Sequence, residues 1–236
     1  MILTTPQTRK YFLVDANIVA GYYLPQCFAS TEGAKKVKTL FDHVRKHPES
    51  HMIYVPNFCI AETINVFTKH SFGKWNRRVK NTIDTRVYTR IVKAFETDIH
   101  NAKFMYHLEL NRYHVLGINL VSPIDNYFKI TTGKNSSPAS TFDHLVVSMG
   151  IQLVKIHGAN NVCVLTADKR LAKIIKKCKS GIKRTTLERM KIGIAEKLCT
   201  VGFSPDIFPN VIDFNELKTV DQKLNDFLKL NSIVKS

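Results

Sequence analysis

The sequence lacks the features that mark several common classes of protein. Its five cysteines are scattered, and none stands in a CxxC pair, which argues against a zinc ribbon or a disulfide framework. No apolar run approaches the length of a membrane span, and no secretory leader precedes the first apolar segment. We therefore expect a cytoplasmic protein that has no membrane partner.

Acidic residues are also scarce. The chain has 19 Asp and Glu against 35 Lys and Arg, which gives a formal net charge of +16 at pH 7. Such an excess of positive charge attracts polyanions and speeds their capture, so nucleic acid is the leading class of partner. A cationic surface that only maintains solubility, or that binds an acidic protein, is the alternative. Hydrophobic residues make up 44% of the 236, which is enough for a sizeable core.

Four short apolar runs are typical of buried strands, and four longer stretches have the pattern of helices. The predicted strands are residues 11–14, 51–55, 161–165 and 210–214, and the predicted helices are residues 30–46, 58–69, 141–157 and 171–179. Strands that alternate with helices indicate a mainly parallel sheet that is covered on both faces. The sequence therefore predicts a three-layer α/β/α fold.

The pattern indicates one domain over residues 1–220, followed by a polar helical tail at residues 221–236. Residues 70–133 are basic, aromatic and mainly helical in pattern, and we interpret them as an insertion within that domain. Residues 115–121 fit either a strand or the end of a helix, and the pattern does not decide between them. Turn-forming residues at 133–140 predict a loop.

Four acidic residues are placed where a site is expected. Asp15 directly follows the first predicted strand, and Asp168 stands three residues past the third. Ligands of open parallel sheets bind beyond these carboxyl ends. Glu62 lies within an apolar helix, where a carboxylate needs a partner, and Asp143 occupies the first turn of another helix. If the first and third strands are adjacent, the four acids can converge on one pocket.

Carboxylates clustered in this way repel one another and need a cation to stay ionised near neutral pH. Mg²⁺ and Mn²⁺ prefer oxygen ligands and retain waters whose positions phosphate oxygens can take. A metal of this kind activates water for attack on a phosphodiester. The pattern of acids therefore points to metal-dependent hydrolysis of a phosphate ester.

Each acid also has a purely structural explanation. Asp15 can start a turn, and Glu62 can pair with a Lys or an Arg. Asp143 completes a capping box that begins at Ser140, and Asp168 suits the N-cap of the helix that follows it. No single acid decides the matter, whereas their order and placement together favour a metal site.

The acids stand in four short motifs. These are FLVDAN at residues 12–17, IAE at 60–62, the segment 140–147 around Asp143, and LTAD at 165–168. In this order the motifs resemble those of the PIN-domain nuclease superfamily, which includes the toxin subunits of many toxin–antitoxin pairs. The predicted last strand resembles that of the family as well, so the similarity extends over residues 10–215.

The resemblance implies a nuclease that uses Mg²⁺ or Mn²⁺ and cleaves RNA, or DNA in some branches of the family. It makes Asn17 and Thr166 polar supports at the rim of the site. It assigns catalysis and metal binding to Asp15, Glu62, Asp143 and Asp168. An inhibitory antitoxin-like protein and a second copy of the chain are the partners that it suggests. Residues 70–133 form a longer stretch than the usual connection in small toxins, and this chain departs from them in that segment.

Two basic clusters are candidate contacts for nucleic acid. A basic rim around an acidic centre can hold the backbone of a strand while one phosphate enters the centre, and an aromatic side chain can stack a base. The first cluster is Lys74, Trp75, Arg77 and Arg78, and the second is Lys169, Arg170, Lys173, Lys176 and Lys177. The alternatives are a solvated basic face with Trp75 in the core, and an ordinary Lys-rich surface helix.

The leading hypothesis is a metal-dependent endoribonuclease in which a four-carboxylate site activates water. A PIN-like module that binds RNA within a larger assembly without cutting it is the alternative. Phosphoryl transfer through an aspartyl phosphate is a third class. That chemistry usually has a second acid two residues after the nucleophile, and the residue at that position here is Asn17.

Overall fold

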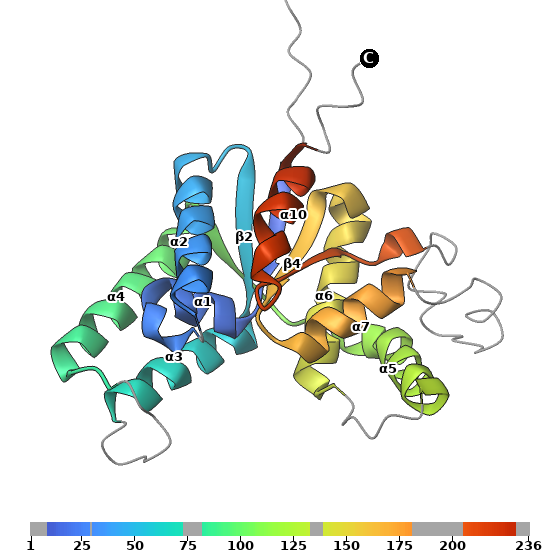
Figure 1. Cartoon of the computed structure of the whole chain (residues 1–236), viewed down its shortest axis with the longest axis horizontal. Helices are drawn as coiled ribbons and strands as arrows, with labels where there is room; N and C mark the ends of the chain where they lie inside the picture. The colour runs from blue at the N-terminus through green and yellow to red at the C-terminus, as the bar shows by residue number, and fades with distance from the viewer. Residues whose placement is uncertain (1–8, 29, 73–81, 133–138, 181–204, 230–236) are drawn as a thin grey trace, which may run out of the picture.

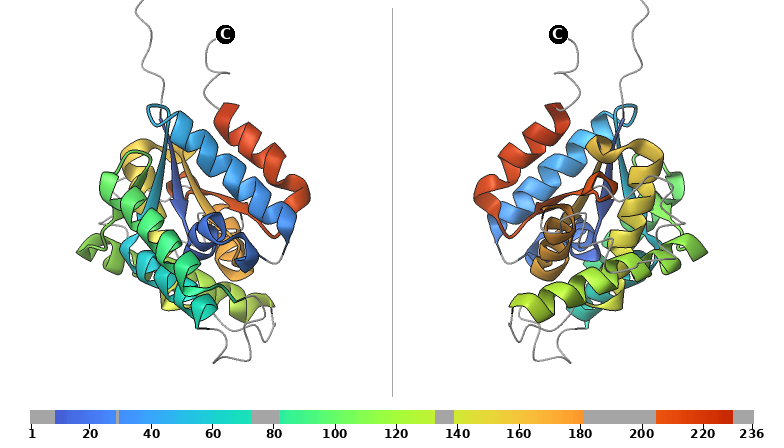
Figure 2. Two further views of the ribbon diagram at one scale, coloured as in Figure 1. Left: turned by 90° about the vertical axis from the view of Figure 1, so that its left-hand side faces the viewer. Right: turned by 90° about the vertical axis from the view of Figure 1, so that its right-hand side faces the viewer.

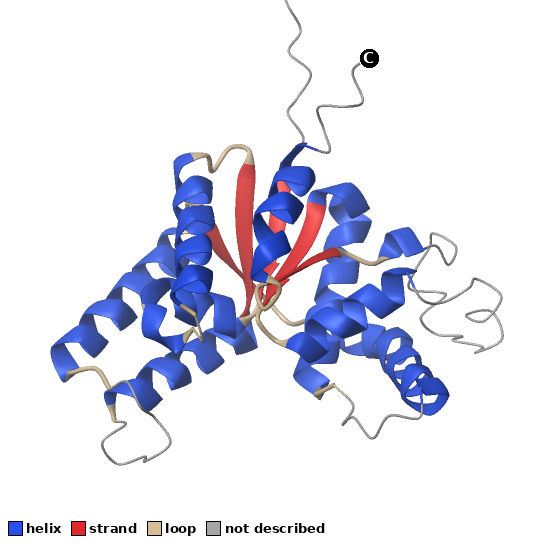
Figure 3. Cartoon of the chain, in the orientation of Figure 1, coloured by secondary structure: helices blue, strands red, loops and turns tan. Residues whose placement is uncertain are grey.

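The computed structural model describes residues 9–28, 30–72, 82–132, 139–180 and 205–229. Five strands form one central sheet in the order β3-β2-β1-β4-β5, and every neighbouring pair is parallel. The strands are β1 (Lys10–Val14), β2 (His51–Pro56), β3 (Met105–Leu108), β4 (Val162–Thr166) and β5 (Asn210–Asp213). Helices surround the strands, so the predicted α/β fold with a parallel sheet is confirmed (Figure 3).

Eight α-helices lie among the described residues. They are α1 (Ala16–Tyr23), α2 (Thr31–Lys46), α3 (Asn57–Ser71), α4 (Thr85–Asn101), α5 (Arg112–Thr132), α6 (Thr141–His157), α7 (Lys169–Ser180) and α10 (Leu217–Lys229). Figure 2 shows the sheet close to edge-on, with α2 and α10 on one face and α4 and α6 on the other. The molecule therefore has the three layers that the alternating pattern predicts.

The central strands are apolar because both of their faces are covered. Phe12, Leu13 and Val14 of β1 are fully buried, and so is every residue of β4. A strand of a two-sided parallel sheet has no solvent face, so it needs no polar alternation. The continuous apolar runs that predicted these strands have this physical origin.

Three segments differ from the predicted elements or resolve an open choice. Helix α1 follows Asp15 directly, and most of its residues are buried, so it has no polar stripe by which the sequence could identify a surface helix. The segment predicted as a helical insertion also supplies β3, which pairs with β2 at one edge of the sheet. Residues 115–121, which fitted two structures, lie within α5.

The C-terminal helix α10 begins at Leu217, four residues before the predicted tail. Its Val220 and Phe227 are buried, and the Phe227 ring lies 5.4 Å from that of Phe12 in an edge-on arrangement. The helix packs beside α2 on one face of the sheet (Figure 2). It is therefore part of the layered fold up to Lys229, where the described residues end.

Strand pairing determines what meets at the carboxyl end of the sheet. Val14 of β1 pairs with Leu165 of β4, and the Asp15 amide donates to the Leu165 carbonyl at 3.1 Å. The strands converge at these ends between α3 and α7 (Figure 1). Because β1 and β4 are adjacent, the residues after both strands lie together.

None of the described helices combines the length with the apolar character that crossing a bilayer requires.

Candidate functional site

A pocket of about 280 Å³ lies beyond the carboxyl ends of β1 and β4. We name it the acid pocket, because all four of the predicted acids line it. Each acid comes from a different part of the chain: the β1–α1 junction, α3, the first turn of α6 and the β4–α7 connection. These acids are Asp15, Glu62, Asp143 and Asp168. The convergence expected from strand adjacency is therefore present in the structure.

Asp15 lies deepest of the four, with 8% of its surface exposed. Its Oδ2 accepts hydrogen bonds from Thr166 Oγ1 at 3.0 Å and from Asn17 Nδ2 at 3.2 Å. Burial raises the pKa of this carboxyl to about 6, the charge of Glu62 adds to the rise, and the hydrogen bonds oppose it. Asn17 and Thr166 were predicted as polar supports at the rim of the site, and both contact Asp15. Asn17 is exposed and lines the acid pocket, whereas Thr166 is fully buried and therefore does not lie at the rim.

Glu62 stands on α3 and is partly buried. Burial raises its pKa, as does the negative charge of Asp143, whereas a hydrogen bond from Cys59 and the charge of Lys69 lower it. One side-chain oxygen each from Asp15 and Glu62, and the sulfur of Cys59, all lie within 4.8 Å of one another. These two acids therefore form a close pair, and the thiol is a third neighbour.

Cys59 is the neighbour that the sequence analysis did not include. An isolated cysteine in an apolar run is usually a small core residue, and Cys59 is indeed fully buried. Its position three residues before Glu62 on the same helix is the signal that could have identified it, because such residues share a face. Burial raises the pKa of the thiol, so it stays protonated near neutral pH.

Asp143 and Asp168 also cap helices. Asp143 Oδ2 accepts from the Ser140 amide at 2.7 Å and from Ser140 Oγ at 2.8 Å, which completes a capping box at the start of α6. Asp168 Oδ1 accepts from the Arg170 amide at 2.6 Å and the Leu171 amide at 3.4 Å, at the start of α7. The structural explanation of these two acids is therefore correct, and it coexists with their place in the pocket.

No family model matches the chain, and no curated protein matches its sequence.

Helix α5 supports the first turn of α6, where Asp143 lies. Asp125 Oδ2 accepts from the Ala139 amide at 2.9 Å and lies 3.3 Å from His144 Nε2. The side chains of Asp125 and His144 are both largely buried. The segment predicted as an insertion therefore helps to hold one wall of the acid pocket.

The predicted basic residues differ in their relation to the acid pocket. Arg170 lines it, together with Lys69 of α3, which the sequence analysis did not single out. Lys169 and Lys173 are exposed on α7, and Lys177 is partly exposed there, but they do not line the pocket. Lys176 is paired with Glu216 at 2.5 Å, so part of its charge is neutralised within the protein.

The first basic cluster cannot be placed in this way. Lys74, Trp75, Arg77 and Arg78 lie outside the described residues.

Proposed function

We propose that this protein is a nuclease that depends on a divalent cation, and that it hydrolyses phosphodiester bonds of RNA at the acid pocket. One observation supports the proposal above all: four carboxylates from four separate parts of a strongly cationic chain line one small pocket. The pocket lies at the end of a parallel sheet where ligands of such folds bind.

The residues of the acid pocket suit Mg²⁺ or Mn²⁺. Both ions prefer carboxylate oxygens, and the nearby thiol of Cys59 has a raised pKa that keeps it protonated. Burial and the negative charge of a neighbouring acid disfavour the ionised forms of Asp15 and Glu62 and raise the pKa of both carboxyls. A bound cation would relieve that electrostatic cost.

Asp143 and Asp168 each keep one carboxylate oxygen that a cation could bind. Asp143 uses Oδ2 and Asp168 uses Oδ1 for helix capping, and the other oxygen of each accepts no hydrogen bond from the described residues. Asp15 is oriented by Thr166 and Asn17. The capping interactions therefore position these carboxylates without using both of their oxygens.

A divalent cation held by these acids would supply the Lewis acidity that lowers the pKa of a water and stabilises charge on the phosphate. Arg170 and Lys69 line the same pocket and would hold the phosphates of the bound strand. Asp15 and Glu62 orient the reacting centre from the buried side. The basic side chains would thus bind the phosphates of the strand, and the acidic side chains would hold the divalent cation.

A second function has an observation in its favour. Asp143 and Asp168 both cap helices, and capping alone would retain these two residues in a module that binds RNA without cutting it. Capping does not explain Asp15, whose ionised form is disfavoured by burial. The effect of Mn²⁺ separates the two functions, because a pure binder should gain no stability from low millimolar metal.

The decisive experiment compares the wild type with Asp15→Asn on end-labelled single-stranded RNA, in Mn²⁺, in Mg²⁺ and in EDTA. Asparagine keeps the shape of the side chain and its acceptor oxygen but removes the charge. We expect cleavage only with metal, and a loss of about 100-fold or more in the variant. RNA binding in EDTA should stay unchanged, which controls for folding. Cleavage by Asp15→Asn at the wild-type rate would exclude the acid pocket from the reaction.

A further inference from the structure

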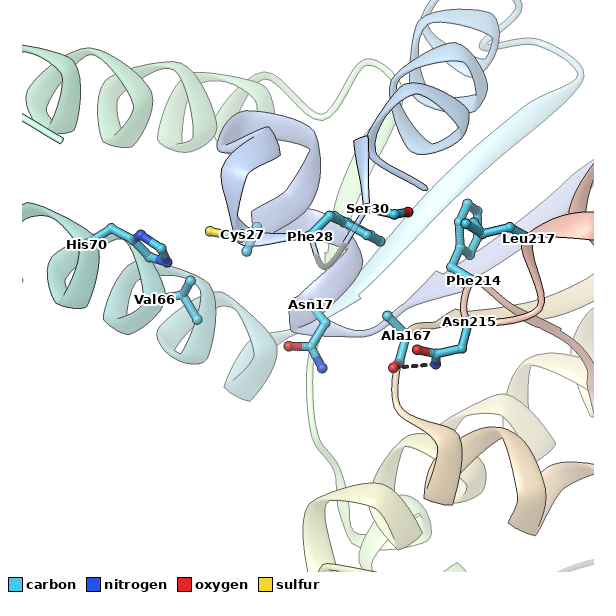
Figure 4. A pocket seen from close by; sticks show the side chains of 11 residues that line it. Asn17, Cys27, Phe28, Ser30, Val66, His70, Ala167, Phe214, Asn215 and Leu217 are labelled. Atoms are coloured by element: carbon cyan, nitrogen blue, oxygen red, sulfur yellow. Dashed lines mark hydrogen bonds between the residues drawn. The ribbon is translucent and has the colours of Figure 1, made fainter. Parts of the chain in front are cut away.

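A second pocket, of about 450 Å³, adjoins the acid pocket (Figure 4). We name it the neutral pocket, because none of its 11 lining residues is Asp, Glu, Lys or Arg. Asn17 and Val66 line both pockets. Ala167 also lines the neutral pocket, and it stands in the chain between Thr166 and Asp168. The two pockets are therefore neighbours along the carboxyl end of the sheet.

Aromatic and aliphatic side chains form much of the neutral pocket. Figure 4 shows Val66 of α3 on one side and Phe214 on the other, with Phe28 between them in this view. A Cβ atom on Gly21 would lie only 1.7 Å from Phe28 Cε2. The Phe28 ring can therefore rest against the α1 backbone only because residue 21 is glycine, and this contact holds the ring in place.

Two amide side chains add hydrogen-bonding groups to this surface. Asn215 Nδ2 donates to the Ala167 carbonyl at 2.6 Å and to Asp213 Oδ1 at 2.8 Å, and Asn17 Nδ2 donates to Asp15. The Oδ1 atoms of both amides accept no hydrogen bond from the described residues. Both asparagines are exposed. The pocket therefore offers two oriented acceptors beside its aromatic rings.

We propose that the neutral pocket holds a nucleobase of the bound strand, next to the phosphodiester at the acid pocket. This inference rests on the proposed function for the identity of the strand. A pocket that has no Asp, Glu, Lys or Arg in its lining suits a flat, uncharged base, which can stack on an aromatic side chain. The adjoining acid pocket contains the cations Lys69 and Arg170, which suit the phosphate. The volume lies within the range of about 300–1,000 Å³ that is typical of small-molecule pockets.

The chemistry of the amides also predicts which bases bind. The two Oδ1 atoms can only accept, so they suit a base that offers more than one N–H donor. The amino group of adenine, cytosine or guanine has two N–H donors, whereas uracil in a nucleotide has only its N3–H. A ligand that leaves one of the acceptors unpaired should bind more weakly. The neutral pocket should therefore prefer the three bases with an amino group.

Cys27 allows a test that requires no cleavage. It lines the neutral pocket and is partly exposed, whereas Cys59, Cys163 and Cys178 are buried. The full chain is treated in EDTA with methyl methanethiosulfonate, and modification of the Cys27 peptide is followed by mass spectrometry. The probes are adenosine, cytidine, guanosine and uridine 5′-monophosphates, with ribose 5-phosphate as the control without a base.

We expect the three amino-bearing nucleotides to slow modification of Cys27 fivefold or more at saturation, uridine monophosphate to slow it less, and ribose 5-phosphate not to slow it. In Asn215→Leu and in His70→Ala, which change opposite walls of the pocket, the protection should fall. Asn225→Leu is the matched control, because Asn225 is an exposed residue of α10 outside this pocket. Melting temperatures of all variants show whether the fold is intact.

Several results would overturn the inference. These are equal protection by ribose 5-phosphate, no protection by any nucleotide, and full protection in both pocket variants at unchanged melting temperature. Failure of the proposed function gives a different result. If nucleotides protect Cys27 but the wild type cleaves no RNA in Mn²⁺, the base site stands and the nuclease does not. If Asp15→Asn abolishes cleavage but no nucleotide protects Cys27, the nuclease stands and the base site does not.

Discussion

The two pairs of acids in the acid pocket differ in what they contribute to the fold. Asp15 and Glu62 are close together, and burial raises the pKa of both, so their ionised forms oppose folding. Asp143 and Asp168 accept hydrogen bonds at the starts of α6 and α7, so their carboxylates support it. No helix cap explains Asp15 or Glu62, because Asp15 makes no side-chain capping hydrogen bond and Glu62 lies within α3. Helix capping does explain Asp143 and Asp168. Asp15 and Glu62 are therefore the stronger sign of function.

The largest expected effect concerns Asp15→Asn in the absence of metal. The pKa of Asp15 is about 6 in the folded protein, against an ordinary value of 3.8. The folded state therefore holds the proton more tightly, and the wild type loses stability as the pH rises from about 4 through 6. Above that range the Asn variant should be more stable by roughly 3 kcal/mol.

Urea denaturation in EDTA at pH 5 and pH 8 measures this difference. The difference in the free energy of unfolding between the variant and the wild type should be larger at pH 8 than at pH 5. Addition of Mn²⁺ should reduce this difference, because the metal should stabilise the wild type alone. Equal stabilities at pH 8 would mean that the charge of Asp15 is not unfavourable, and the contrast between the two pairs would disappear.

Asp125→Ala should have the next largest effect. The change leaves the Ala139 amide and His144 without their shared acceptor, which should cost about 2 kcal/mol of stability. Cleavage should fall as well, because the first turn of α6 positions Asp143. Asp125→Asn keeps an acceptor oxygen and serves as the matched control. An Asp125→Ala protein that cleaves like the wild type would show that α5 does not position the site.

Substitutions of Asp168 separate its two roles. Asp168→Ala removes the cap of α7 and should lower stability by about 1 kcal/mol. Asp168→Asn retains a capping oxygen and should keep the stability within a few tenths of a kcal/mol, yet it should lose cleavage if the charge binds the cation. Denaturant midpoints and cleavage rates measured on both variants test this. Wild-type cleavage by Asp168→Asn would leave Asp168 with a capping role only.

The smallest expected effect concerns the basic side chains near the acid pocket. Arg170 lines the acid pocket, whereas Lys176 is paired with Glu216. For RNA binding, the logarithm of the association constant falls linearly with the logarithm of the salt concentration. Arg170→Ala should reduce the magnitude of this slope by about one, and Lys176→Ala should change the slope less. Binding in EDTA at several salt concentrations measures both slopes. Equal slopes for the two variants would show that the position at the pocket is unimportant for holding phosphate.

Much of the fold could be predicted because burial leaves a pattern in the sequence. The apolar runs of β1 and β4, and the periodic stripe of α2, each reflect which faces are covered. Helix α1 has no such stripe because most of it is buried. Strand β3 has only four residues, in a segment whose pattern is otherwise helical. A short helix that is mostly buried and a strand of four residues therefore give too weak a signal.

The candidate site was predictable in part for the same reason. Asp15 and Asp168 follow strands, so their level above the sheet could be inferred from the pattern alone. Cys59, Glu62 and Lys69 share a face of α3, as their spacing of three and seven residues predicts. That this face turns toward β1 and lines the acid pocket depends on packing between elements and is not encoded in a local motif.

The sequence by itself determined the class of fold, the excess of positive charge and the positions of four acids relative to strands and helices. These follow from local periodicity and composition, which act over a few neighbouring residues. Only the tertiary structure decided that β1 lies beside β4, that α5 supports the start of α6, and that a neutral pocket adjoins the acidic one. Such contacts join residues more than ten positions apart, and their geometry arises from the packing of the whole domain.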